Sequence, residues 1–128
     1  MGDDAARKRL GASGERLAAG WLEARGYHIL VRNWRCAYGE IDLIAEREGD
    51  GVLAFVEVKT RRGDRLGAPE EAITLAKRRR LIASAQTYLA EQGAESRPYS
   101  IDVLAVALEP SGRLRAIRHY PNSVEGEE

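Results

Sequence analysis

The sequence predicts a single α/β domain in which the elements follow the order αβββαββ. Three observations support this. A chain of 128 residues with 44% hydrophobic content is long enough for one compact core and too short for two. Two long segments carry apolar residues at helical spacing. Five shorter segments either alternate between apolar and polar residues or are apolar throughout, as strands do.

The first half of the chain holds one helix and three strands. From Asp4 to Arg25, apolar residues recur every three or four positions, and Gly26 is a suitable stop, so a helix is expected there. Tyr27–Cys36 is rich in β-forming residues. Gly39–Arg47 and Gly51–Thr60 both alternate, and the Gly-Asp-Gly turn between them predicts a hairpin.

The second half begins with another helix. After Pro69, an apolar stripe runs from Ile73 to about Gln92 and closes at Gly93. The segment Ser100–Leu108 is almost continuously apolar, which is typical of a strand covered on both faces. Leu114–His119 is short enough to be an edge strand.

Charge is distributed unevenly along a chain of zero net charge. From Glu57 to Arg80, eight basic residues outnumber four acidic ones, and the basic residues are Lys59, Arg61, Arg62, Arg65, Lys77, Arg78, Arg79 and Arg80. Residues 122–128 contain three Glu and little to bury, so we expect residues 1–121 to form the domain and the rest an acidic flexible tail. The single Cys36 and the absence of an apolar leader or spanning segment favour a cytoplasmic protein without a membrane.

Acidic residues gather on one face of the predicted hairpin. Side chains two residues apart in a strand share a face, so Glu57 and Lys59 point together. If Gly49 and Asp50 are the central residues of a two-residue turn, Asp42 lies opposite Glu57 and Glu40 lies opposite Lys59. If the turn slips by one residue, Asp42 lies opposite Lys59 and remains diagonal to Glu57. A three-residue loop would break this arrangement.

Two opposed carboxylates destabilise a sheet unless a positive charge lies between them. A divalent cation such as Mg²⁺ (or Mn²⁺) fits this role, because it takes oxygen ligands from one or two carboxylates and keeps water molecules that a phosphate can replace. A cation held by Asp42 and Glu57 would support phosphodiester hydrolysis, with Lys59 orienting water or stabilising the charge that develops on phosphorus.

The spacing of these residues resembles a known signature. Asp42, fourteen intervening residues, and then Glu57-Val58-Lys59 look like the Asp...Glu-x-Lys motif of the restriction-endonuclease-like nucleases. More narrowly, the chain resembles the YraN-like family of small bacterial proteins, predicted endonucleases related to archaeal Holliday-junction resolvases. Matching stretches, together covering roughly residues 12–110, are Gly14-Glu15, Gly39–Ala45, Phe55–Arg61 and the basic start of the second helix.

The resemblance implies a restriction-endonuclease-like three-layer fold, with a central mixed sheet flanked by helices. It implies that Asp42, Glu57 and the backbone carbonyl of Val58 bind the metal ion and that Lys59 is the catalytic lysine. It also implies that Glu15 on the first helix approaches the metal or its water shell, although a Glu near a helix start can instead cap the helix or complement its dipole. A homodimer is expected by analogy.

Two further acidic residues are candidate secondary site residues. Glu40 lies on the predicted acidic face, and Asp102 recurs in the family pattern inside an apolar strand, where an unpaired carboxylate would be costly. His28 and His119 are instead expected to be ordinary strand residues.

Basic residues flank the predicted site. Arg61 and Arg62 follow the third strand and are candidate phosphate contacts, as are Lys77 and Arg78 on the second helix. Consecutive helical residues cannot all face one way, so a solvated helix face is an alternative for the last two. The predicted function is a metal-dependent endonuclease acting on DNA, with branched or structured DNA as one candidate substrate and RNA as an alternative one. The alternative is a catalytically silent nucleic-acid-binding module.

Overall fold

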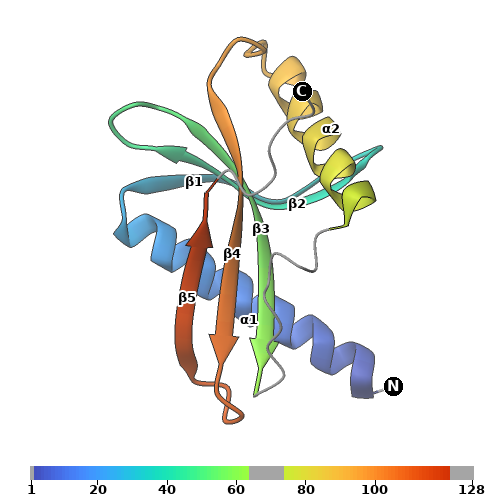
Figure 1. The fold of residues 1–128 in the computed structure, drawn as a ribbon, viewed down its shortest axis with the longest axis vertical. Coiled ribbons are helices and arrows are strands. Elements are labelled where there is room, and N and C mark those ends of the chain that lie inside the picture. The colour runs from blue at the N-terminus through green and yellow to red at the C-terminus, as the bar shows by residue number, and fades with distance from the viewer. Residues whose placement is uncertain (1, 64–73, 122–128) are drawn as a thin grey trace.

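The computed structural model describes residues 2–63 and 74–121. It confirms the predicted αβββαββ order in an α/β fold with a mixed sheet between helices (Figure 1). None of the helices among the described residues is long and apolar enough to cross a membrane. The elements are α1 (Gly2–Ala24), β1 (Tyr27–Cys36), β2 (Gly39–Arg47), β3 (Leu53–Arg62), α2 (Leu75–Glu91), β4 (Tyr99–Leu108) and β5 (Leu114–Tyr120).

The five strands form one sheet in chain order, β1-β2-β3-β4-β5. Neighbouring strands are antiparallel except for β3 and β4, which are parallel. Parallel neighbours need a crossover, and the segment that contains α2 provides it. Figure 1 shows the β1–β2 hairpin strongly rotated relative to β3, β4 and β5. The sheet is therefore open and twisted where β2 meets β3.

Each helix covers a different face of the sheet. On β3, Ala54 and Val56 belong to the core beneath α1, whereas Leu53 and Phe55 belong to the core beneath α2. Alternate residues of one strand point to opposite faces, so the two helices and the sheet form three layers. Both cores combine aliphatic and aromatic residues, with Tyr27 on the α1 side and Phe55 and Tyr88 on the α2 side.

The β2–β3 hairpin has the first of the two predicted registers, with Leu43 opposite Val56 and Ala45 opposite Ala54. The predicted two-residue turn is wrong, because five residues, 48–52, connect the end of β2 at Arg47 to the start of β3 at Leu53. The Arg47 N–H donates to the Val52 carbonyl across its base, at 2.9 Å, and the Gly51 N–H donates back to the Arg47 carbonyl. The positive φ angles of Gly49 and Gly51 permit the longer loop, and β3 therefore begins at Leu53 instead of Gly51.

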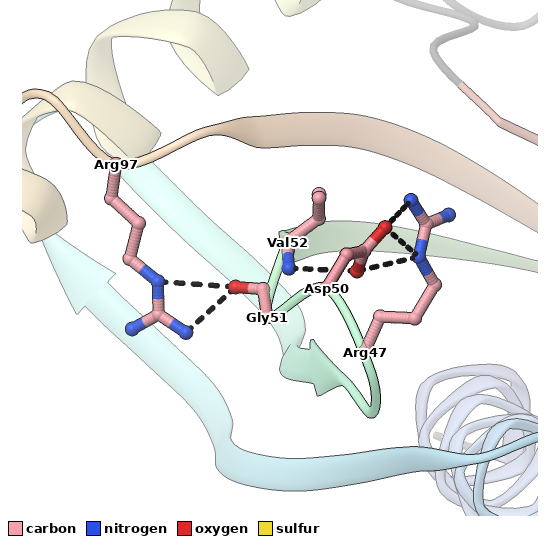
Figure 2. A network of polar contacts seen from close by, with 5 residues as sticks. All are labelled: Arg47, Asp50, Gly51, Val52 and Arg97. Atoms are coloured by element: carbon pink, nitrogen blue, oxygen red, sulfur yellow. Dashed lines mark hydrogen bonds and ion pairs between the residues drawn. The ribbon is translucent and has the colours of Figure 1, made fainter.

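Two arginines hold this loop in place (Figure 2). Arg47 pairs with Asp50, whose carboxylate also accepts the Val52 N–H at 3.1 Å. Arg97, just before β4, donates two hydrogen bonds to the Gly51 carbonyl, at 3.1 and 2.8 Å. The end of the hairpin is thus tied to the start of β4, which stabilises the register of all three strands.

The second helix begins with a cap that the sequence analysis did not identify. The side chain of Thr74 accepts the Lys77 N–H at 3.0 Å, and the first helical residue is Leu75. The predicted helix start at Ile73 and the predicted acidic tail at residues 122–128 both lie outside the described residues.

Candidate metal centre

The candidate centre lies where β2 and β3 separate. Their paired residues end at Leu43 and Val56. Asp42, the residue that precedes Leu43 on β2, turns its side chain into the gap, and its Oδ2 accepts the Val58 N–H at 2.8 Å. The N–H and C=O of one strand residue point to the same side, so the Val58 carbonyl also faces this gap. The predicted ligands Asp42 and Val58 are therefore brought together at the end of the ladder.

The carboxylate of Glu57 lies close to the ammonium groups of two lysines. It is only 5% exposed and lies on the α2 side of β3. Its Oε2 lies 3.4 Å from the Nζ of Lys59, two residues along the same strand, and 3.1 Å from the Nζ of Lys77 in the first turn of α2. A carboxylate this deeply buried requires compensating charge, and two ammonium groups provide it.

Asn33 connects two further carboxylates and was not identified from the sequence. With its amide nitrogen turned towards them, that nitrogen lies 3.2 Å from Glu15 Oε1 and 3.1 Å from Glu40 Oε2. Asn33 lies between the β1–β2 pairs Arg32–Leu43 and Trp34–Ile41, which places it opposite Asp42. Its φ of 54° is in the left-handed region that asparagine tolerates. An asparagine within a β-rich segment is the signal that could have indicated this irregularity.

A close helix–strand approach positions Glu15. A Cβ atom added to Gly14 would lie 1.8 Å from Thr60 Oγ1, so only glycine permits α1 to lie this close to β3. Glu15 is the next residue along α1. The structure places its carboxylate beside Asn33 and close enough to Glu57 for the two negative charges to repel each other.

Burial and repulsion from neighbouring carboxylates raise the pKa values of Asp42 and Glu15. The pKa of Asp42 rises from 3.8 to about 7, mainly because burial disfavours its charge and because Glu57 is close; the Val58 N–H partly offsets the shift. The pKa of Glu15 is also raised, by burial first and then by Glu40. Such a group of carboxyls would be stabilised by an added cation.

An open cavity of about 150 Å³ lies over Asp42 and Glu57. Its acidic wall comes from the sheet, and its basic wall comes from Lys77 and Arg80 on α2. The complete lining is Gly39, Glu40, Asp42, Glu57, Lys77, Arg80, Leu81 and Ser84. A cation and an anion could therefore bind side by side within it.

The donor set fits a hard cation that keeps part of its hydration shell. Within residues 2–63 and 74–121, no three His, Cys, Asp or Glu side chains are arranged to hold a metal ion. Asp42, Glu57 and the Val58 carbonyl could supply two carboxylates and one backbone oxygen. Mg²⁺ is commonly bound by one or two carboxylates and fills its remaining positions with water and phosphate oxygens. Mn²⁺ accepts similar ligands.

Other predicted residues lie away from this cavity. Arg62 donates to the Pro110 carbonyl at 2.9 Å and lines a separate pocket with Arg9. The side chain of Arg61 turns back to the carbonyl of Thr60, at 3.1 Å. On α2, Arg78 does not line the cavity, whereas Arg80, which was not singled out from the sequence, does. Helical geometry explains the difference, because positions 77, 80 and 84 share one face.

Asp102, predicted as a secondary site residue, lies outside the cavity. It is 2% exposed on the α1 side of β4, and its Oδ2 lies 2.8 Å from His119 Nε2. The ring of His119 meets that of Trp21 edge-on, with 5.6 Å between the ring centroids. His119 is thus more than an ordinary strand residue, because it satisfies a carboxylate that is buried beneath α1.

The fold and the cavity define a three-layer α/β protein with a mixed acidic and basic site. Residues 14–106 match the model of an uncharacterised protein family, UPF0102, and the chain belongs to that family. It is 55% identical over 108 residues to UPF0102 protein STH1475 of Symbiobacterium thermophilum, covering 84% of this chain and 90% of that protein. It is 48% identical over 120 residues to a UPF0102 protein of Roseiflexus castenholzii, covering 93% and 95%.

Proposed function

We propose that this protein is a metal-dependent endonuclease of the restriction-endonuclease-like superfamily that hydrolyses phosphodiester bonds in DNA. The observation that carries the proposal is the convergence of Asp42, Glu57 and Lys59 beside a cavity whose opposite wall is basic. The order αβββαββ, with a mixed sheet between two helices, is consistent with the superfamily fold.

Each of these residues has a defined task in this mechanism. Asp42, Glu57 and the Val58 carbonyl would hold Mg²⁺ or Mn²⁺, which when bound would polarise the phosphoryl oxygen and acidify a water molecule. Lys59 lies beside Glu57 and would orient the attacking water and stabilise the negative charge that develops at phosphorus. Glu15 and Asn33 would orient water from the α1 side. Arg80 and Lys77 would bind the phosphate on the α2 side.

One observation favours the alternative, a catalytically silent nucleic-acid-binding module. Glu57 already pairs with Lys59 and Lys77, so its charge is compensated without a metal ion. The raised pKa of Asp42 argues against this alternative, because a module that binds only polyanions gains nothing from burying a carboxyl group beside another one.

Cleavage assays distinguish the two functions. Labelled single-stranded, duplex, flap and four-way-junction DNA, and matching RNA, are incubated with Mg²⁺, Mn²⁺ or chelator. Asp42→Asn and Lys59→Ala should each lower the cleavage rate by about 100-fold or more, the scale found when a charge-stabilising group is removed. Asp50→Asn, in the distant hairpin loop, is the matched control and should cut normally. Metal-independent binding without cleavage of any substrate would support the silent module.

The same samples test the proposed partners. Sedimentation of the protein alone and with its best substrate would show whether it acts as a homodimer, which is proposed here by analogy with enzymes that cut two strands symmetrically.

A further inference from the structure

The ammonium group of Lys77 lies beside the carboxylate that would bind the metal. Its Nζ is 3.1 Å from Glu57 Oε2, closer than the Nζ of Lys59. A cation bound to Glu57 would therefore meet a positive charge that is already in place. Either the cation is repelled or Lys77 must move.

We propose that Lys77 is an internal counterion. Its ammonium group pairs with Glu57 while no metal ion is bound, and it leaves Glu57 when a nucleic-acid phosphate enters the cavity. This inference rests on the proposed nuclease function and concerns the regulation of the same site. In the free protein, the positive charge of Lys77 would weaken metal binding at Glu57. Once a phosphate attracts Lys77 away from Glu57, the metal ion could bind there. Metal and nucleic acid would then bind cooperatively, and each would raise the affinity of the protein for the other.

The placement of the two lysines shows which of them can move. Lys59 is two residues from Glu57 on a central strand, and its side chain is 20% exposed. Lys77 belongs to the first turn of α2, and its side chain is 32% exposed. A lysine has a long flexible stem, so Lys77 can turn from Glu57 towards the cavity without a change in the helix backbone.

The cavity offers the Lys77 ammonium group a second place to bind when it leaves Glu57. Arg80 lies almost one turn further along α2 and lines the same cavity as Lys77 and Glu57. A phosphate between Lys77 and Arg80 would be bound by two cations on one helix face. The first turn of α2 adds the positive end of the helix dipole on this side. Phosphate therefore competes with Glu57 for Lys77.

The test measures metal affinity in the absence of nucleic acid. Mn²⁺ is titrated into metal-free protein, and the free ion is followed by electron paramagnetic resonance. Lys77→Met should bind Mn²⁺ about tenfold more tightly than the wild type, within the usual range of coupling between sites. Lys77→Gln should do the same and serves as a second variant if the first folds poorly. Circular dichroism checks the fold of each.

Arg80→Met is the matched control. It removes one positive charge from the same cavity, and no ion pair joins Arg80 to Glu57 within the described part of the chain. This control should change the affinity by no more than about twofold to threefold, the general effect of charge at a distance. Equal effects of Lys77→Met and Arg80→Met, or weaker binding in Lys77→Met, would overturn the inference.

A further variant separates failure of the inference from failure of the proposed function. Asp42→Asn should abolish saturable Mn²⁺ binding if the centre is a metal site. If the wild type shows saturable binding that Asp42→Asn removes, but the Lys77 variants behave as the control does, only the counterion role is refuted. If neither the wild type nor Lys77→Met shows saturable binding, the metal centre itself is refuted.

Discussion

Asp42 should make the folded protein less stable at neutral pH when no metal ion is present. Its carboxyl group is buried beside Glu57, and its pKa is raised from 3.8 to about 7. The substitution Asp42→Asn removes the charge and keeps an oxygen that can accept the Val58 N–H, which Asp42 accepts at 2.8 Å. The variant therefore isolates the cost of ionising the group inside the protein.

Whether stability rises or falls with pH follows from which state, folded or unfolded, binds the Asp42 proton. Between pH 3.8 and about 7 the folded state holds the Asp42 proton and the unfolded chain does not, so stability falls as pH rises through this window. Each pKa unit corresponds to 1.36 kcal/mol, and a shift of about three units gives an upper value of about 4 kcal/mol. Partial solvent access reduces this value, and we expect Asp42→Asn to be more stable than the wild type by about 2–4 kcal/mol at pH 8 and by almost nothing at pH 4.

Urea denaturation in chelator, at pH 4 to 8, measures this difference. Asp50→Asn provides a control of opposite sign, because Arg47 lowers the pKa of Asp50 to about 2 and the variant should lose stability at neutral pH. Adding Mg²⁺ at pH 8 should stabilise the wild type and leave Asp42→Asn unchanged. A stability difference between Asp42→Asn and the wild type that is the same at pH 5 and pH 8 would refute the reasoning.

Three other substitutions test the surroundings of the centre. Gly14→Ala should destabilise the fold by about 1–3 kcal/mol, since its Cβ would lie 1.8 Å from Thr60 Oγ1, and Thr60→Ala in the same chain should recover part of the loss in thermal denaturation. Asn33→Ala should be less stable than Asn33→Gly by about 1 kcal/mol in urea titration, because φ is 54° there; equal stabilities would contradict the strained backbone. Thr74→Ala should cost about 1 kcal/mol of stability by loss of the α2 cap, whereas Thr74→Ser should cost little.

Local patterns predicted most of the fold. The two hairpin strands Tyr27–Cys36 and Gly39–Arg47 begin and end where the sequence predicted. Residue alternation and glycine stops are properties of the strand or helix itself, so they can be recognised without the tertiary structure. The conformation of the loop after Arg47 could not be predicted in this way, because it includes a contact with Arg97, which binds the Gly51 carbonyl from a distant segment.

The site was predicted less completely, for a similar reason. Asp42, Glu57 and Lys59 come from neighbouring strands, and hairpin register was enough to bring them together. Lys77 and Arg80 reach the cavity only because α2 packs against the other side of it. The sequence alone did not show which of the four consecutive basic residues of α2 face the cavity. The packing of the helix was needed to decide this. Long-range packing was also needed to show that Asp102 pairs with His119.

The break in the sheet is what makes the proposed chemistry available. If the pairing of β2 and β3 continued beyond Leu43 and Val56, the polar backbone atoms of Val58 would be used within the ladder. The left-handed backbone of Asn33, opposite Asp42, interrupts the regular alternation at this point. Asp42 can then bind the Val58 N–H, and the Val58 carbonyl faces the gap. A regular hairpin with the same carboxylates would hold two repelling charges and would use the Val58 backbone atoms within the ladder, so the proposed centre depends on the end of the pairing as well as on its acidic residues.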